Sequence, residues 1–224
     1  MAMAERWGMT MGRITMDDRL ALAQMLSPAF PVGAYAYSQG LEQAMSDGVV
    51  HDAVSLTDWV SQVLRHGSGR MDAIFLACAR RGGDLAALDA LALAYAPCAE
   101  RAGEMRDQGA AFAQVLAAIR GEAQPELTYA GGFGRATRGM RLSTAEILGL
   151  WLQALCAQLI SAAVRFVPLG GAEGQAVLAR LAPVIADVAE SCAGLGVDEL
   201  GSATFGADLA AMRHETLEVR IFRT

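Results

Sequence analysis

The stretch from Ile147 to Val164 contains no charged residue, and this run constrains the fold of the chain more than any other feature. Its length reaches the lower limit for a helix that crosses a membrane. Gln153, Gln158 and Ser161 interrupt its apolar character, however, and Gly149 weakens it. A helix that is surrounded by other helices needs the same apolarity on every face. We therefore predict that this run is the buried central helix of a bundle, and that the chain has no membrane partner.

Composition favours an all-α, single-domain helical bundle. Hydrophobic residues make up 54% of the 224 residues and aromatic residues only 6%, so small and aliphatic side chains must build the core, which suits close helix packing. The net charge is −6 without a basic stripe, which argues against a nucleic-acid partner. All 18 basic residues are arginine, and the lack of lysine excludes a Walker A lysine and Schiff-base chemistry.

Capping residues, glycines and prolines divide the chain. We predict helices at residues 20–26, 36–45, 55–66, 70–81, 85–95, 98–120, 144–164 and 173–192. Residues 121–132 are the most loop-like interior region, and Pro183 should kink the last of these helices. We expect residues 1–14 to form a flexible extension without a signal peptide, residues 15–211 to form the helical domain, and residues 212–224 to form a detachable tail.

The reactive side chains give little indication of catalysis or metal binding. Four cysteines stand far apart in apolar settings, which is typical of buried free thiols in a reducing cytoplasm. They are Cys78, Cys98, Cys156 and Cys192. His51, His66 and His214 lack a second ligand at helical spacing, so we predict no metal site. No GxSxG motif is present, and we predict that the chain is not an enzyme.

A glycine-rich segment, Gly131 to Gly134, should make a turn or a tight helix contact, because the GxGxxG spacing and the lysine of phosphate loops are absent. Arg135, Arg138 and Arg141 follow at intervals of three and form one basic edge if that segment is helical. Such an edge is usually solvated. Its functional alternatives are a contact with an acidic partner and an arginine finger supplied to a GTPase.

The segment from Ser27 to Glu42, SPAFPVGAYAYSQGLE, combines two prolines, two glycines and two tyrosines. Proline restricts the backbone and removes hydrogen-bond donors, while glycine permits turns, so this loop is predicted to be stiff. It places Tyr35, Tyr37 and Ser38 at a junction between loop and helix, where they can face a partner or a buried neighbour.

The C-terminal residues alternate charged groups with large apolar groups. Arg213, His214, Glu215 and Arg220 lie in this segment together with Phe222. A short chain end rarely compensates for its own ordering entropy, yet a purely solvated tail would not carry such apolar side chains. We predict that the tail is mobile in the free chain and becomes ordered when a partner binds.

These two segments, Ser27 to Glu42 and Met212 to Phe222 (MRHETLEVRIF), resemble the N-terminal signature and the C-terminal tail of the UreF family of urease accessory proteins. Blocks at residues 64–73 (LRHGSGRMDA), 104–109 (EMRDQG) and 161–170 (SAAVRFVPLG) are similar to further family blocks in the same order. The resemblance covers most of residues 17–224. The sequence departs from the family at LTYAGGFGRATR, where a Pro-Val-Ala-Phe-Gly-like segment is usual.

The resemblance implies an all-helical homodimeric chaperone without catalysis of its own. Such a protein binds the accessory protein UreD, also called UreH, and recruits the GTPase UreG, so that nickel is delivered to apo-urease. Nickel and GTP would act through those partners, and this chain would bind no cofactor tightly. Tyr35, Tyr37, Ser38 and Glu42 would serve the dimer or a UreG-facing surface. The residues that would dock on UreD are Arg213, His214, Glu215, Arg220 and Phe222.

The competing hypothesis is a GTPase-activating-type regulator of UreG that supplies an arginine in trans. Arg135, Arg138, Arg141 and Arg220 are its candidates.

Overall fold

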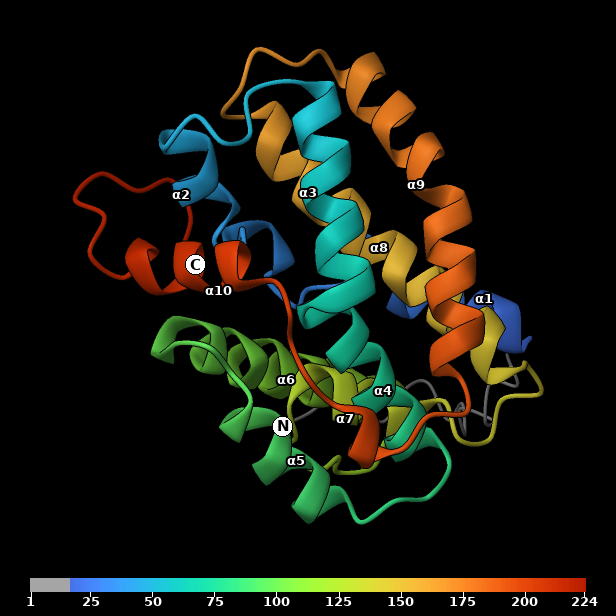
Figure 1. The fold of residues 1–224 in the computed structure, drawn as a ribbon. Helices are drawn as coiled ribbons and strands as arrows, with labels where there is room; N and C mark the ends of the chain where they lie inside the picture. Colours follow the sequence, from blue (N-terminus) through green and yellow to red (C-terminus); the bar gives the residue numbers. More distant parts are fainter. Residues whose placement is uncertain (1–16) are drawn as a thin grey trace, which may run out of the picture.

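The computed structural model describes residues 17–224, and all of the regular elements in this part are helices (Figure 1). The elements are α1 (Asp18–Met25), η1 (Ala34–Ala36), α2 (Leu41–Ser46), α3 (Ala53–His66), α4 (Ser68–Arg80), α5 (Leu85–Ala94), α6 (Ala99–Arg120), α7 (Tyr129–Ala136), α8 (Thr144–Val164), α9 (Gly171–Cys192), η2 (Val197–Glu199) and α10 (Phe205–His214). The predicted all-α, single-domain bundle is confirmed. The predicted N-terminal extension lies outside the described residues.

Helix α8 is the central helix that the uncharged run predicts. It begins with a capping box, in which Glu146 N–H donates to Ser143 Oγ at 3.1 Å and Ser143 N–H donates to Glu146 Oε2 at 2.8 Å. It packs against α9, α4 and α3, and Figure 1 shows it passing behind α3 beside α9. Within residues 17–224, α8 alone is long and apolar enough to cross a membrane, and 56% of its most apolar stretch is buried inside the bundle.

The helix predicted at residues 36–45 is broken in the structure. Tyr37 is extended, and Gln39 and Gly40 have positive φ values of 54° and 80°. An α-helix cannot continue through left-handed residues, so α2 begins only at Leu41. The junction therefore consists of a 3₁₀ turn, an extended stretch and a short helix.

Two helices occur where the sequence indicates loops or irregular structure. Helix α7 lies partly in the interior region predicted to be a loop, and Gly134 brings it against α4: a Cβ on Gly134 would lie 2.9 Å from Ala79 Cβ. The tight glycine contact predicted for this segment is thus confirmed. Helix α10 lies beyond the last helix predicted from the sequence, after a stretch that contains Gly194, Gly196 and Gly201. Helix α9 continues through Pro183.

Candidate functional site

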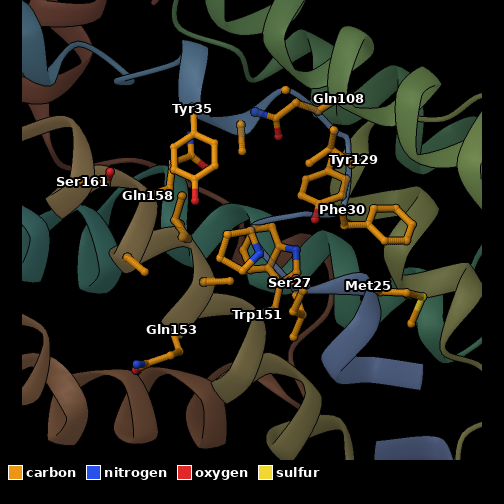
Figure 2. A pocket seen from close by; sticks show the side chains of 18 of the residues that line it. Met25, Ser27, Phe30, Tyr35, Gln108, Tyr129, Trp151, Gln153, Gln158 and Ser161 are labelled. Atoms are coloured by element: carbon orange, nitrogen blue, oxygen red, sulfur yellow. The ribbon is translucent and has the colours of Figure 1, made fainter. Parts of the chain in front are cut away.

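The loop between α1 and α2 forms one wall of a cavity of about 750 Å³ (Figure 2). Trp151 and Gln158 of α8 also line this cavity. The centroids of the Tyr129 and Trp151 rings are 6.2 Å apart, so aromatic packing supports the cavity from the side of α7. Tyr35 lines the same cavity but remains 47% exposed. The stiff loop therefore presents one tyrosine outward at the edge of a hollow.

The end of this loop lies directly against α10. A Cβ on Gly40 would lie only 2.6 Å from the main-chain nitrogen of Ala211. Glycine is therefore required here both by its positive φ and by the close approach of the second helix. This contact holds the start of α2 against the helix that leads into the C-terminal segment.

Glu42, in the first turn of α2, is fully buried. Its carboxylate binds main-chain N–H groups of the C-terminal segment. Ile221 N–H donates to Glu42 Oε1 at 2.6 Å, and Phe222 N–H donates to Glu42 Oε2 at 3.0 Å. His214 Nε2 lies 2.9 Å from the same Oε2 atom. Hydrogen bonds to a buried carboxylate are among the stronger ones in proteins, so Glu42 orders residues that are otherwise at a chain end.

His214 connects this carboxylate to α6. Its side chain is fully buried, and its Nδ1 lies 2.7 Å from Glu100 Oε2. The other carboxylate oxygen of Glu100 pairs with Arg220. Helices α2, α6 and α10 and the C-terminal segment thus meet at one histidine.

The final residues run alongside the junction before α2. Ser38 N–H donates to a main-chain oxygen of Thr224 at 2.8 Å, and the Ser38 hydroxyl bonds the same oxygen. Arg223 N–H donates to the Ala36 carbonyl at 2.7 Å. Phe222 is 4% exposed, and the Arg165 guanidinium lies 4.6 Å from its ring centroid. We call residues 36–42 together with residues 214–224 the C-terminal clasp.

A buried ionic layer supports the clasp from α6. Arg101 pairs with Glu104 at 3.0 Å and with Asp72, and Gln39 Nε2 donates to Glu104 Oε1 at 3.0 Å. Burial raises the pKa of Asp72 above its ordinary value, and the neighbouring Arg101 opposes this shift. Burial by itself lowers the pKa of Arg101, but Glu104 and Asp72 outweigh that effect and leave it above its ordinary value. The layer is a set of mutually dependent charges.

Tyr37 links the C-terminal clasp to α6 through its hydroxyl group. Its hydroxyl donates to Asp107 Oδ2 at 3.1 Å and accepts from Arg223 Nη1 at 2.9 Å. Burial, followed by the hydrogen bond to Asp107, raises the pKa of Tyr37 to about 12. The phenol is therefore neutral at physiological pH and acts as a hydrogen-bonding bridge between α6 and the tail.

The UreF family model matches residues 50–182, which is more than half of the chain. This chain belongs to the UreF family. The urease accessory protein UreF of Cereibacter sphaeroides is 55% identical over 205 residues, covering 92% of this chain and 98% of that relative. The urease accessory protein UreF of Paracoccus denitrificans is 52% identical over 207 residues, covering 92% and 96%. The resemblance seen in the sequence motifs is thereby confirmed.

The two UreF-like ends of the sequence form one site. Glu42 from the first segment contacts His214 and Phe222 from the second, while Tyr37 and Ser38 bond the two residues that follow Phe222. All five of these predicted site residues are buried. In this structure they position the C-terminal segment and have no free surface for a partner. Their binding to a partner stays a prediction.

The other predicted site residues keep exposed surface. Tyr35 lies at the cavity rim, Arg213 pairs with Asp47 at 3.0 Å, and Arg220 is held by the α6 carboxylate. Glu215 accepts a hydrogen bond from a main-chain N–H of α6 at 3.1 Å. These residues are accessible to another protein in a UreF-family complex, and that contact stays a prediction.

The structure differs from the predicted detachable tail. Met212 to His214 belong to α10, and the residues after 219 are docked on the chain's own bundle. The apolar side chains of the tail are few, but main-chain hydrogen bonds to Glu42 and Ser38 compensate for the ordering of this segment.

Sequence reasoning missed the contribution of α6 to the site. Arg101, Glu104 and Gln108 are buried at intervals of three and four along this helix. A polar series with helical spacing, beside the buried Met105 and Phe112, indicates an internal charged face rather than a solvated one. This spacing is visible in the sequence and predicts a buried polar face on the helix.

The arginines proposed as a finger for a GTPase have different environments. Arg138 donates to the Ala79 carbonyl at 2.7 Å, and Arg135 donates to Gln124 Oε1 at 2.6 Å. Helix α7 ends before Arg138, so the predicted single basic edge does not form. The Arg141 side chain is 96% exposed, and its Nε lies 3.7 Å from Asp18 Oδ2.

The remaining cysteines and histidines do not add to the site. Cys78, Cys156 and Cys192 are buried free thiols as predicted, and burial raises the pKa of Cys156 to about 12. Cys98 is only half-buried, unlike the buried thiol predicted at this position. Its Sγ caps the start of α6 and accepts from a main-chain N–H at 3.5 Å. Within residues 17–224 no three His, Cys, Asp or Glu side chains are arranged to hold a metal ion.

Proposed function

We propose that this chain acts in urease maturation as a non-catalytic scaffold, which binds UreD (UreH) and recruits UreG so that nickel reaches apo-urease. The observation that supports the proposal is family membership, since relatives that match 92% of the chain are named urease accessory protein UreF. Nickel and GTP act through the partners on this proposal, and no cofactor is bound tightly by this chain. The working form is a cytoplasmic homodimer.

The outer side of the clasp is the surface that we assign to UreD. Val219 is 83% exposed and Ile221 is 60% exposed, although both belong to an ordered segment. On the neighbouring helix α10, Phe205, Leu209 and Met212 share one exposed face at intervals of four and three. Exposed patches of large apolar side chains are typical of protein–protein contacts. A docked tail presents them at a smaller ordering cost than a mobile tail.

The rim of the cavity is the surface that we assign to the dimer or to UreG. Tyr35 and Leu150 both line the cavity, and they are 47% and 51% exposed. A tyrosine held by a stiff loop offers a large contact area with little loss of side-chain freedom. This surface comes from η1 and from α8, whereas the surface assigned to UreD comes from α10 and the tail.

Co-purification of an affinity-tagged chain with co-expressed UreD and UreG tests the proposal. We expect Val219→Asp combined with Ile221→Asp to lose UreD, because both residues are exposed and the charges oppose apolar contact. Val54→Asp on α3, where the side chain is 65% exposed, is the matched control and should retain UreD. Tyr35→Ala should retain UreD but weaken self-association or UreG recruitment. The proposal is wrong if the wild-type chain retains neither partner.

The alternative, a GTPase-activating regulator, is supported by one observation: the exposed side chain of Arg141. Arg141→Ala would then lower the rate of GTP hydrolysis by UreG while binding of UreG is retained. An unchanged hydrolysis rate in the complex removes this alternative and leaves the scaffold.

A further inference from the structure

His214 is enclosed by acidic groups from two different helices. Its Nε2 lies 2.9 Å from Glu42 of α2, and its Nδ1 lies 2.7 Å from Glu100 of α6. The ring has no exposed surface, so bulk water cannot replace either contact. Each ring nitrogen therefore has a carboxylate oxygen as its partner.

Neutral imidazole has one N–H donor and one bare nitrogen, whereas an ionised carboxylate can only accept. A neutral His214 would thus direct a bare nitrogen at a carboxylate oxygen. Other donors hold both carboxylates in their ionised form: Glu42 accepts the N–H groups of Ile221 and Phe222, and Glu100 pairs with Arg220. The arrangement that satisfies all of these atoms is an imidazolium that donates to both carboxylates.

The surrounding charges agree with this assignment. From the tail, Arg220 faces Glu100 but makes no contact with Glu42. At the end of α10, Arg213 forms an ion pair with Asp47, and Glu215 accepts a hydrogen bond from the main-chain N–H of residue 100. The half-buried Cys98 thiol lies near these groups and carries no charge while protonated, and burial, the largest influence on it, raises its pKa. A charged His214 is thus the only cation in contact with the Glu42 carboxylate among residues 17–224.

We propose that His214 is a doubly protonated pin for the C-terminal clasp, and that loss of its proton releases the tail from Arg220 onward. The link is Glu42, because the same carboxylate holds His214 and the N–H groups of Ile221 and Phe222. When the proton leaves, one imidazole contact becomes repulsive and Glu42 loses its buried cation. The inference concerns the free chain and holds whether or not UreD is the partner.

The first test reads the protonation state directly in the wild-type protein. The chain contains only three histidines, so ¹⁵N spectra of the untagged protein give three imidazole rings. At pH 7 we expect one ring with both nitrogens protonated, and this signal should vanish in His214→Gln. His66→Gln, at an exposed position, should remove a different ring. A neutral His214 with one bare nitrogen at pH 7 and a docked tail overturns the proposal.

The second test measures release of the tail by trypsin cleavage after Arg220, with the rate divided by that of a small ester substrate at each pH. We expect the wild-type rate to rise at least tenfold between pH 7 and pH 9.5. His214→Gln should be cleaved rapidly at both pH values, and His66→Gln should behave as wild type. Equal protection of His214→Gln and wild type at pH 7 contradicts the pin. Should His214→Gln fail to fold by circular dichroism, the wild-type spectra and pH profile still decide the question.

Discussion

At the scale of single residues, two glycines of α6 occupy opposite environments. A Cβ on Gly109 would overlap the carbonyl group of Leu127, whereas a Cβ on Gly103 would meet no atom within 4 Å. Both lie inside the same helix, where alanine has the higher helix propensity. The two positions therefore separate the effect of packing from the effect of propensity.

We expect Gly109→Ala to lower the free energy of unfolding by about 1–3 kcal/mol, which is the usual cost of overpacking. Gly103→Ala should raise it by up to about 1 kcal/mol. Urea denaturation followed by circular dichroism measures both values. A Gly109→Ala variant as stable as Gly103→Ala would show that α6 does not approach the loop before α7 as described.

At the scale of elements, helix boundaries that depend on local capping could be predicted from the sequence. Cys98 starts α6 and Ser143 starts α8 as expected, because each cap is formed by neighbouring residues. The break before α2 and the existence of α10 could not be predicted in this way. They depend on the contact between Gly40 and Ala211 and on hydrogen bonds such as that between Glu42 and Phe222, which are 180 residues apart. The motifs at both chain ends were visible in the sequence, but their pairing was not.

The capping box of α8 makes a pH-dependent contribution to stability. The hydrogen bonds from Ser143 lower the pKa of Glu146, so its stabilising effect is present above the pKa of the unfolded chain and is lost as the pH falls through the folded value. Glu146→Gln should therefore be less stable than wild type at pH 7, and the difference should disappear in acid. Thermal unfolding from pH 7 to pH 3 measures it. Glu190→Gln, at an exposed position on α9, is the control and should show no such gap.

Deletion of residues 216–224 should destabilise the bundle. The deletion removes the buried Phe222 ring and leaves the Glu42 carboxylate without two of its donors. Loss of a large buried aromatic side chain costs about 3–5 kcal/mol, so the thermal midpoint should fall by roughly 6–20 °C. Calorimetry of the truncated and full chains gives the values, and Val219→Ala serves as a control with the tail docked. An unchanged thermal midpoint would support the prediction of a detachable tail.

At the scale of the whole molecule, α8 organises the bundle, and the clasp closes its C-terminal side. Leu152 is fully buried between α8 and its neighbours, whereas Leu150 on the same helix is 51% exposed beside the cavity. The uncharged run thus contributes both to the core and to the proposed partner surface.

Leu152→Ala should reduce the free energy of unfolding by about 2–5 kcal/mol, because it leaves a cavity in the core. Leu150→Ala should cost less than about 1 kcal/mol and act instead on self-association or UreG recruitment. Chemical denaturation together with sedimentation velocity distinguishes the two effects. Equal losses of stability in both variants would contradict the burial of Leu152 and the exposure of Leu150 on α8.

Urease activation in cells tests the central proposal most directly. The host carries the urease structural and accessory genes but lacks its own UreF, and the readout is urease activity per amount of purified urease together with its nickel content. The scaffold account predicts that the wild-type chain and Val54→Asp restore both, whereas Val219→Asp combined with Ile221→Asp restores neither despite normal folding. Full activation by the double variant, or none by the wild-type chain, would contradict the account.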